Sequence, residues 1–172
     1  MQVAVLLGAS GALTGGLVGL ATGAAWGGIG LGRMGPLMAA TLTGLVLLAD
    51  LAGVRPLAVG KQVPQAWGRL FGARLTAILY GARLGVGPLT ILRSWTWWAA
   101  LVIGASQGPW PSAAVGGAFA LSRTLATVLA GRGATTGLQM RDRMGTLTAA
   151  EPAVVRSVTV VLAVTALSTA LA

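Results

Sequence analysis

Four long stretches of this chain contain no acidic or basic side chain. They are residues 1–32, 34–49, 94–122 and 157–172. Among 172 residues only 9% are charged, with 12 Lys and Arg against 3 Asp and Glu, whereas a soluble domain carries about 25%. A water-soluble fold of this length needs more polar surface than that. The uncharged stretches therefore predict an integral membrane protein with several apolar helices.

The missing residue types exclude most enzyme chemistry. The chain has no cysteine and no histidine, and its acidic residues are Asp50, Asp142 and Glu151. Thiol–disulfide exchange, iron–sulfur ligation, ordinary zinc sites, histidine-ligated haem and imidazole-based catalytic triads all need residues that this chain lacks. Three carboxylates do not build a carboxylate-rich metal cage on one chain. We therefore expect no enzyme activity, no cofactor and no metal site.

The apolar stretches predict an all-α fold, a polytopic transmembrane helical bundle that forms a single integral membrane domain. Its six membrane segments are expected at about 2–25, 36–54, 75–92, 94–108, 112–130 and 153–171. The first segment should end near the glycine-rich run 27–30, because a helix over all of 1–32 would measure about 48 Å, against a hydrocarbon core of roughly 30 Å. Pro36 suits the first turn of the second segment, and residues 108–111 predict a tight turn.

The positive charges gather in two polar segments, 55–74 and 131–152. Cytoplasmic loops carry such an excess of Lys and Arg, so we expect both as cytoplasmic loops of a protein in the inner cell membrane. The net charge of +9 is spread singly between apolar segments, which does not indicate a nucleic-acid partner. Two loops on one side need an even number of crossings between them. That holds if 75–92 re-enters as two half-helices, which leaves five full crossings; counting it as a full span gives six.

The tryptophans are expected mostly as interfacial anchors: Trp26, Trp67, Trp95, Trp97, Trp98 and Trp110.

Five glycines stand at every fourth position of the first segment. They are Gly11, Gly15, Gly19, Gly23 and Gly27. At this spacing they form one ridge of a helix, and the missing side chains let another backbone approach closely. Cα–H···O contacts and dispersion then replace the hydrophobic driving force that is absent in lipid. The ridge serves either helix packing within this chain or contact with another subunit.

The segment from Tyr80 to Thr90 combines glycines, a proline and Arg83 in apolar surroundings. Glycine and proline weaken a helix, and irregular backbone at membrane depth is either buried by protein or lines a water-filled cavity. An arginine there needs a partner or an aqueous path, and many transporters build their central site from a broken helix and a charge. We expect Arg83, Thr90, Tyr80 and Asp50 to form a substrate-binding site. Alternatively, Arg83 and Arg93 snorkel to one interface.

Asp50 is the only acidic residue inside a predicted segment, and it has two interpretations. It either pairs with Arg83 or relays protons, or it marks the end of its helix and pairs with Arg55. Arg123, inside the segment 112–130, raises the same question as Arg83.

Two sequence runs resemble a known family. They are Lys61-Gln62-Val63-Pro64-Gln65-Ala66-Trp67 and Tyr80-Gly81-x-x-Leu84-Gly85-x-Gly87-x-x-Thr90. The chain resembles small actinobacterial membrane proteins related to the cytochrome c biogenesis and thiol–disulfide transporter (DsbD/CcdA-like) family of the lysine-exporter superfamily, mainly over residues 60–130. The resemblance implies two inverted three-helix repeats whose first and fourth segments are broken near the membrane centre. The redox members of that family carry a cysteine in each broken element, so their thiol chemistry does not transfer to this chain.

Two hypotheses for function follow. The first is a protein of transporter-like fold that moves a small or anionic solute by a non-redox mechanism. The alternative is a non-catalytic membrane subunit or scaffold whose glycine ridge packs against a partner membrane protein. In either case the partners expected are the lipid bilayer and a second membrane subunit, which could be another copy of this chain.

Overall fold

Every secondary-structure element in the described part of the chain is a helix. The computed structural model describes residues 2–30, 35–57, 66–89, 92 and 94–132, and then 138–139, 142–143, 145–146, 149, 157–158, 160–162, 164–165 and 168. The helices are α1 (Gln2–Gly28), α2 (Gly35–Leu51), α3 (Ala66–Leu70), α4 (Gly72–Gly85), α5 (Thr96–Ser106) and α6 (Pro109–Gly131). This establishes the all-α class.

The second helix ends three residues before its expected end, and a glycine is the cause. Gly53 has a φ of +70°, and the N–H groups of Gly53 and Val54 donate to the carbonyl oxygens of Asp50 and Ala49 at 3.1 and 2.9 Å. A left-handed glycine with this pair of bonds is the Schellman motif, which closes a helix. The apolar run continues past Leu51, but the backbone does not.

The third expected segment, 75–92, becomes α4, which begins and ends earlier than expected. Gly72 (φ +66°) is the first residue of α4, one residue after the short α3 ends at Leu70, and Gly87 (φ +67°) follows the C-terminus of α4. Both glycines adopt a backbone conformation that other residues rarely accept. The expected polar loop 55–74 therefore contains α3 and the first turn of α4.

The turn expected over residues 108–111 is shorter in the structure, because α6 already begins at Pro109. Gln107 and Gly108 make the turn, and Gly108 has a φ of +109°. A proline is well suited to the first position of a helix, where its missing N–H has no intrahelical partner to lose.

The last expected segment, 153–171, and the expected loop 131–152 lie largely outside the described residues. Those that are described between 138 and 168 are helical, so the second polar segment contains helix where a loop was expected.

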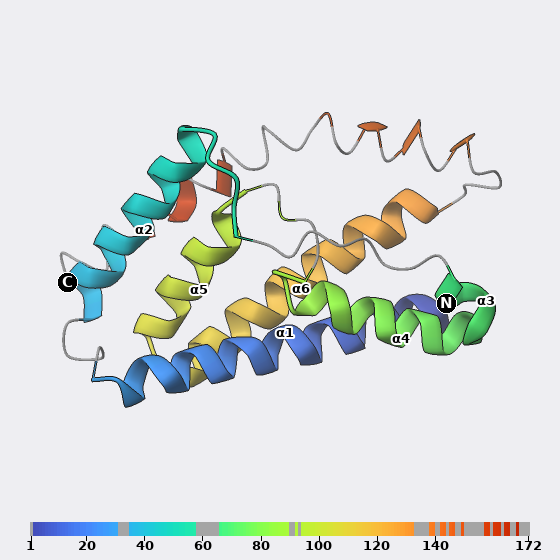
Figure 1. Cartoon of the computed structure of the whole chain (residues 1–172), viewed down its shortest axis with the longest axis horizontal. Coiled ribbons are helices and arrows are strands. Elements are labelled where there is room, and N and C mark those ends of the chain that lie inside the picture. The colour runs from blue at the N-terminus through green and yellow to red at the C-terminus, as the bar shows by residue number, and fades with distance from the viewer. Residues whose placement is uncertain are drawn as a thin grey trace.

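Two long helices, α1 and α6, lie along each other and run in opposite directions (Figure 1). Gly23 of α1 lies beside Pro109 at the start of α6, and Gly11 lies beside Thr124 further along α6. Helix α4 packs on the N-terminal half of α1 and runs parallel to it, since Gly81 faces Leu7 and Gly85 faces Gly11. Helices α2 and α5 form a second pair at the other end.

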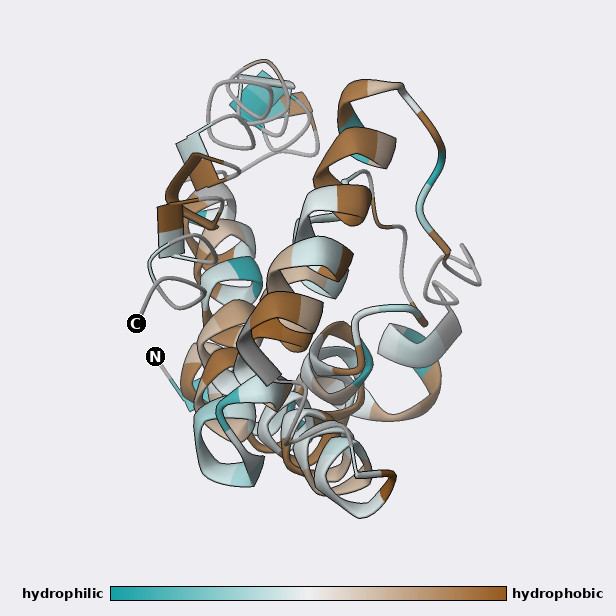
Figure 2. Ribbon diagram, turned by 90° about the vertical axis from the view of Figure 1, so that its left-hand side faces the viewer, coloured by the Kyte–Doolittle hydropathy of each residue, from teal (hydrophilic) through white to brown (hydrophobic). Residues whose placement is uncertain are grey.

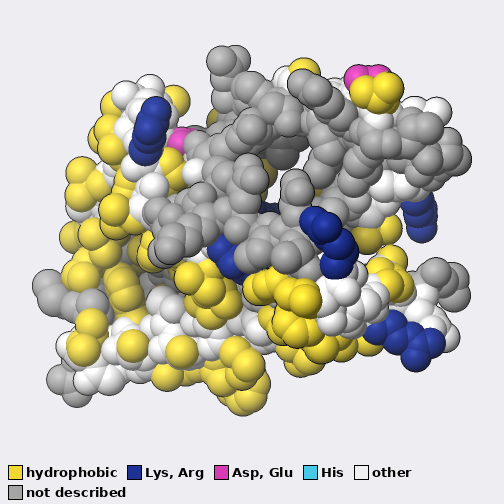
Figure 3. Space-filling view, turned by 45° about the vertical axis from the view of Figure 1, so that its right-hand side comes forward, with side chains coloured by type: hydrophobic (Ala, Val, Ile, Leu, Met, Phe, Trp, Pro, Cys, Tyr) yellow, Lys and Arg dark blue, Asp and Glu magenta, His cyan; other side chains and the backbone are white. Residues whose placement is uncertain are grey.

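Two described helices are long and apolar enough to cross a membrane, namely Gln2–Gly28 and the part Pro109–Leu129 of α6. Within the apolar 18-residue stretch of each helix, only 22% is buried. Most of these residues, such as Leu13 and Leu17, therefore face outwards. Shorter apolar helices cover Leu37–Leu51 and Thr96–Ser106. Strongly hydrophilic positions are few along these ribbons (Figure 2). In Figure 3, hydrophobic side chains gather on the left and along the lower edge of the described surface. Long helices with outward-facing apolar residues favour association with a membrane.

Candidate functional site

The close packing around α1 uses its glycine ridge. Gly11, Gly15, Gly19 and Gly23 are buried. A Cβ on Gly19 would meet the Ser112 carbonyl group, and one on Gly23 would lie 2.7 Å from Pro109 Cα. Gly27, the fifth predicted member, has no atom within 4 Å of such a position. Four of the five glycines therefore face another helix of the same chain.

On the side of α4, the same ridge meets two further glycines. A Cβ on Gly81 would meet the carbonyl oxygen of Leu7, and one on Gly85 would meet that of Gly11. The hydroxyl of Thr14 lies 3.0 Å from the carbonyl oxygen of Ala82 and can donate to it. Because the backbones touch here, the end of α4 is fixed against the middle of α1.

Helix α4 therefore stops partway along α1. Its last residue, Gly85, lies between Gly11 and Gly15, whereas α1 continues to Gly28. The 14 residues of α4 span about 21 Å, less than a hydrocarbon core of roughly 30 Å. Chain direction changes after Gly87, whose Cα packs against the indole of Trp97 at the start of α5.

Two arginines lie at nearly the same level along α1. A Cβ on Gly11 would lie 3.3 Å from the Gly81 carbonyl oxygen and 3.0 Å from Thr124 Cγ2. Arg83 follows Gly81 by two residues on α4, and Arg123 directly precedes Thr124 on α6. Both side chains are half-buried. Gly11 lies nine residues beyond the start of α1, about 14 Å along a helix axis.

Aromatic side chains connect Arg123 to the break after α4. The guanidinium carbon of Arg123 lies 5.7 Å from the ring centre of Phe119, within the range of a cation–π contact. Phe119 in turn stacks on Trp97, with ring centres 4.4 Å apart. Trp97 is 0% exposed, so the expectation that this tryptophan anchors an interface is wrong. Periodicity did not reveal this role, because Trp97 packs against Gly87, ten residues earlier in the break after α4.

Asp50 has a different partner from those predicted. Its two oxygens accept hydrogen bonds from the Ser94 hydroxyl at 3.0 Å and the Trp95 backbone N–H at 3.1 Å. Ser94 Oγ also accepts from the N–H of Thr96 at 3.1 Å. These bonds cap the first turn of α5, where N–H groups have no intrahelical acceptor. Asp50 therefore joins the end of α2 to the start of α5, and it pairs with neither Arg83 nor Arg55.

The indole N–H groups of two tryptophans support the same junction. Trp95 donates to the Val54 carbonyl oxygen at 2.7 Å, and Trp98 donates to that of Leu57 at 3.2 Å. The chain after α2 is thereby tied to the N-terminal half of α5.

Of the remaining predicted site residues, only Tyr80 lies in the described part of the chain. Tyr80 is half-buried on α4, one turn before Arg83. Thr90 and Arg93 lie outside the described residues. Among the residues that are described, no group of three or more His, Cys, Asp and Glu is placed to hold a metal ion.

No protein-family model matches this chain, and no curated protein or solved structure matches it either. The resemblance to the DsbD/CcdA-like family stays a prediction.

Proposed function

We propose that this protein is a multi-pass protein of the inner cell membrane that moves a small anionic solute by a non-redox mechanism. The observation that carries the proposal is the common level of Arg83, near the end of α4, and Arg123 on α6. An arginine at the bilayer centre costs about 2.5–3.5 kcal/mol on insertion scales. Two arginines at one depth together attract an anion to that level of the membrane.

In this proposal α4 and α5 are two half-helices of one interrupted crossing. Helix α4 covers the N-terminal half of α1, and the turn after α5 lies at Gly23 near the other end. With α1, α2 and α6, and with the expected segment 153–171, the chain has six membrane segments and five crossings. Residues 55–74 and 131–152 then share the cytoplasmic side, as their charge favours.

Broken helices suit an anion pathway because they bring backbone and charge together. Irregular backbone at membrane depth requires protein or water partners, and the break after Gly85 lies next to Arg83. Arg83 is in the last turn of α4, where the helix dipole stabilises a cation. This stabilisation offsets part of the cost of the charge.

The scaffold alternative has less support. The ridge formed by Gly11, Gly15, Gly19 and Gly23 is covered by α6 and α4 of the same chain. It is therefore not available to a partner without separating these helices.

Flux through proteoliposomes tests the proposal. Radiolabelled chloride, acetate, phosphate and sulfate are supplied in turn, and uptake of at least one should exceed that of protein-free vesicles. Arg83→Ala and Arg123→Ala should each reduce this uptake to background, whereas Arg83→Lys should keep part of it. Arg132→Ala, which removes an exposed arginine at the end of α6, is the matched control.

Absence of uptake of all four anions by the unaltered protein would contradict the proposal. So would full uptake by Arg83→Ala, because the snorkelling alternative predicts only a mild effect of that substitution.

A further inference from the structure

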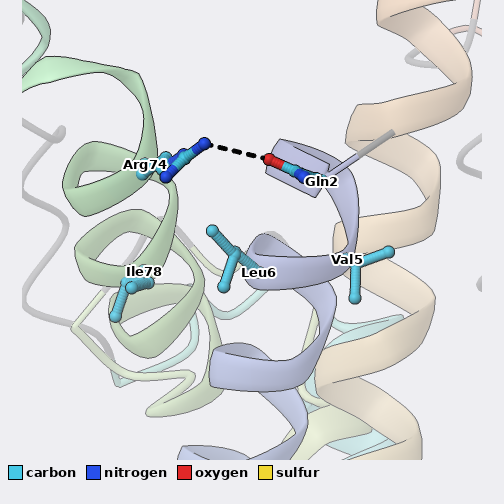
Figure 4. Close-up of a pocket in the computed structure, with 5 residues that line it drawn as sticks. All are labelled: Gln2, Val5, Leu6, Arg74 and Ile78. Atoms are coloured by element: carbon cyan, nitrogen blue, oxygen red, sulfur yellow. Dashed lines mark hydrogen bonds between the residues drawn. The ribbon is translucent and has the colours of Figure 1, made fainter.

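A pocket opens between α1 and α4 at the ends where both helices begin. Gln2, Val5 and Leu6 line it from α1, and Arg74 and Ile78 line it from α4 (Figure 4). Its volume is about 500 Å³. The pocket exists because the close contact of the two helices ends at Gly81: one turn earlier Ile78 carries a branched side chain, which holds the backbones apart.

The walls are apolar and the rim is cationic. Val5 and Ile78 are 62% and 38% exposed, and Leu6 lies between them in Figure 4. At the rim, Arg74 Nη2 donates a hydrogen bond to Gln2 Oε1 at 3.2 Å. This partner is a neutral amide, which does not neutralise the positive charge of Arg74.

The local backbone adds to that positive charge. Arg74 lies in the first turn of α4, which has no acidic residue, and Phe71 at its N-cap makes no side-chain capping bond. The N-terminus of a helix carries partial positive charge and favours anions. An arginine at this position therefore opposes the dipole unless an anion lies nearby. Arg69, in the last turn of α3, adds a further cation close in sequence.

We propose that this pocket binds one anionic phospholipid of the cytoplasmic leaflet, with its phosphate at Arg74 and an acyl chain against Leu6 and Ile78. The inference rests on the membrane placement proposed above. A guanidinium binds phosphate through parallel hydrogen bonds, and the volume lies in the range of small-ligand sites, about 300–1,000 Å³. A soluble anion would leave the apolar wall unused.

Native mass spectrometry of the detergent-solubilised full chain tests the inference. The probes are phosphatidylglycerol and phosphatidylcholine with identical acyl chains. Phosphatidylglycerol should bind the unaltered protein more tightly. Arg74→Ala should weaken its binding about fivefold, since one basic residue near the surface contributes about 1 kcal/mol, and should weaken phosphatidylcholine less, because the choline cation balances the phosphate of that lipid. Ile78→Trp, which fills the pocket, should weaken both lipids. Arg132→Ala removes an exposed arginine outside the pocket and should change neither.

Equal binding of both lipids to the unaltered protein would overturn the inference, and so would unchanged phosphatidylglycerol binding to Arg74→Ala or Ile78→Trp. Binding of glycerol phosphate as tight as that of phosphatidylglycerol would show a soluble-anion site and would also overturn it. If only the proposed transport function is wrong, the unaltered protein will show no anion flux but will still bind phosphatidylglycerol. The two failures are therefore distinguishable. Release of the protein from membranes by carbonate washing would contradict the membrane placement itself.

Discussion

Gly15 and Gly116 face each other so closely that a Cβ on either residue would meet the carbonyl oxygen of the other. This reciprocal contact lies where α1 crosses α6, and Ala120 is the next side chain along, 2.8 Å from the same Cβ position on Gly15. In lipid, where apolar side chains gain nothing by leaving their solvent, such backbone approach is the main source of helix association. The stability of the whole bundle should therefore depend on residues that have no side chain.

On the glycine ridge, Gly19→Ala should destabilise the protein and Gly27→Ala should not. Gly19→Ala places a methyl group on the Ser112 carbonyl, and such overpacking costs about 1–3 kcal/mol. Gly27→Ala meets nothing within 4 Å and gains helix propensity of about 1 kcal/mol. Thermal unfolding in detergent, followed by tryptophan fluorescence, should show a lower midpoint for the first and an equal or higher one for the second. A shift in the same direction for both would contradict the packing role.

The bulkier change Gly19→Leu should lower the midpoint further, or break an oligomer if one forms. Leu17→Ala serves as its control, because Leu17 is 62% exposed and lies off the ridge.

Substitution by alanine should destabilise the protein more at Gly87 than at Gly53, which has the same backbone conformation. Gly87 and Gly53 have φ values of +67° and +70°, so both substitutions carry left-handed strain of about 1–2 kcal/mol. Only at Gly87 would the new methyl group also meet Trp97, 2.5 Å from its indole nitrogen. The midpoint for Gly87→Ala should therefore fall below that for Gly53→Ala. Equal losses would mean that α5 moves aside without cost.

Asp50 should matter for stability and not for proton movement. Asp50→Ala removes the acceptor for the Trp95 N–H and the Ser94 hydroxyl, and losing a helix cap costs about 0.5–2 kcal/mol. Asp50→Asn keeps one acceptor oxygen and should lose less. In the flux assay, Asp50→Asn should keep its uptake, because the proposed mechanism uses no proton at this residue. Abolished uptake with an unchanged unfolding midpoint would restore the proton-relay interpretation.

The sequence predicted the helices more closely than their contacts. The helical class and approximate location of α1 follow from uncharged runs, and the ridge follows from a spacing of four. The end of α2 depended instead on a left-handed glycine inside an apolar run, which hydropathy does not register. The partner of Asp50 was also beyond prediction, because Ser94 and Trp95 are more than forty residues away and a local pattern indicates only that a helix end is near. Arg83 and Arg123 were each recognised as unusual, but their common level depends on how α4 and α6 dock on α1.

The side of the membrane on which each polar segment lies is open to direct measurement, since the chain has no cysteine of its own. Single cysteines at Gln65 and Thr146 belong to the segments predicted to be cytoplasmic, so an impermeant thiol reagent should not label them in intact cells.

Gln107→Cys is the matched control: Gln107 is exposed in the turn between α5 and α6, at the opposite end of α1 from Gln2, and should be labelled without permeabilisation. All three should react once the membrane is permeabilised. Helix α4 runs parallel to α1 and α6 runs antiparallel to it, so the start of α4 and the end of α6 should share a side. Labelling of Thr146→Cys or Gln65→Cys alone in intact cells would contradict the predicted topology, and labelling of both Gln65→Cys and Thr146→Cys with none at Gln107→Cys would invert the whole protein.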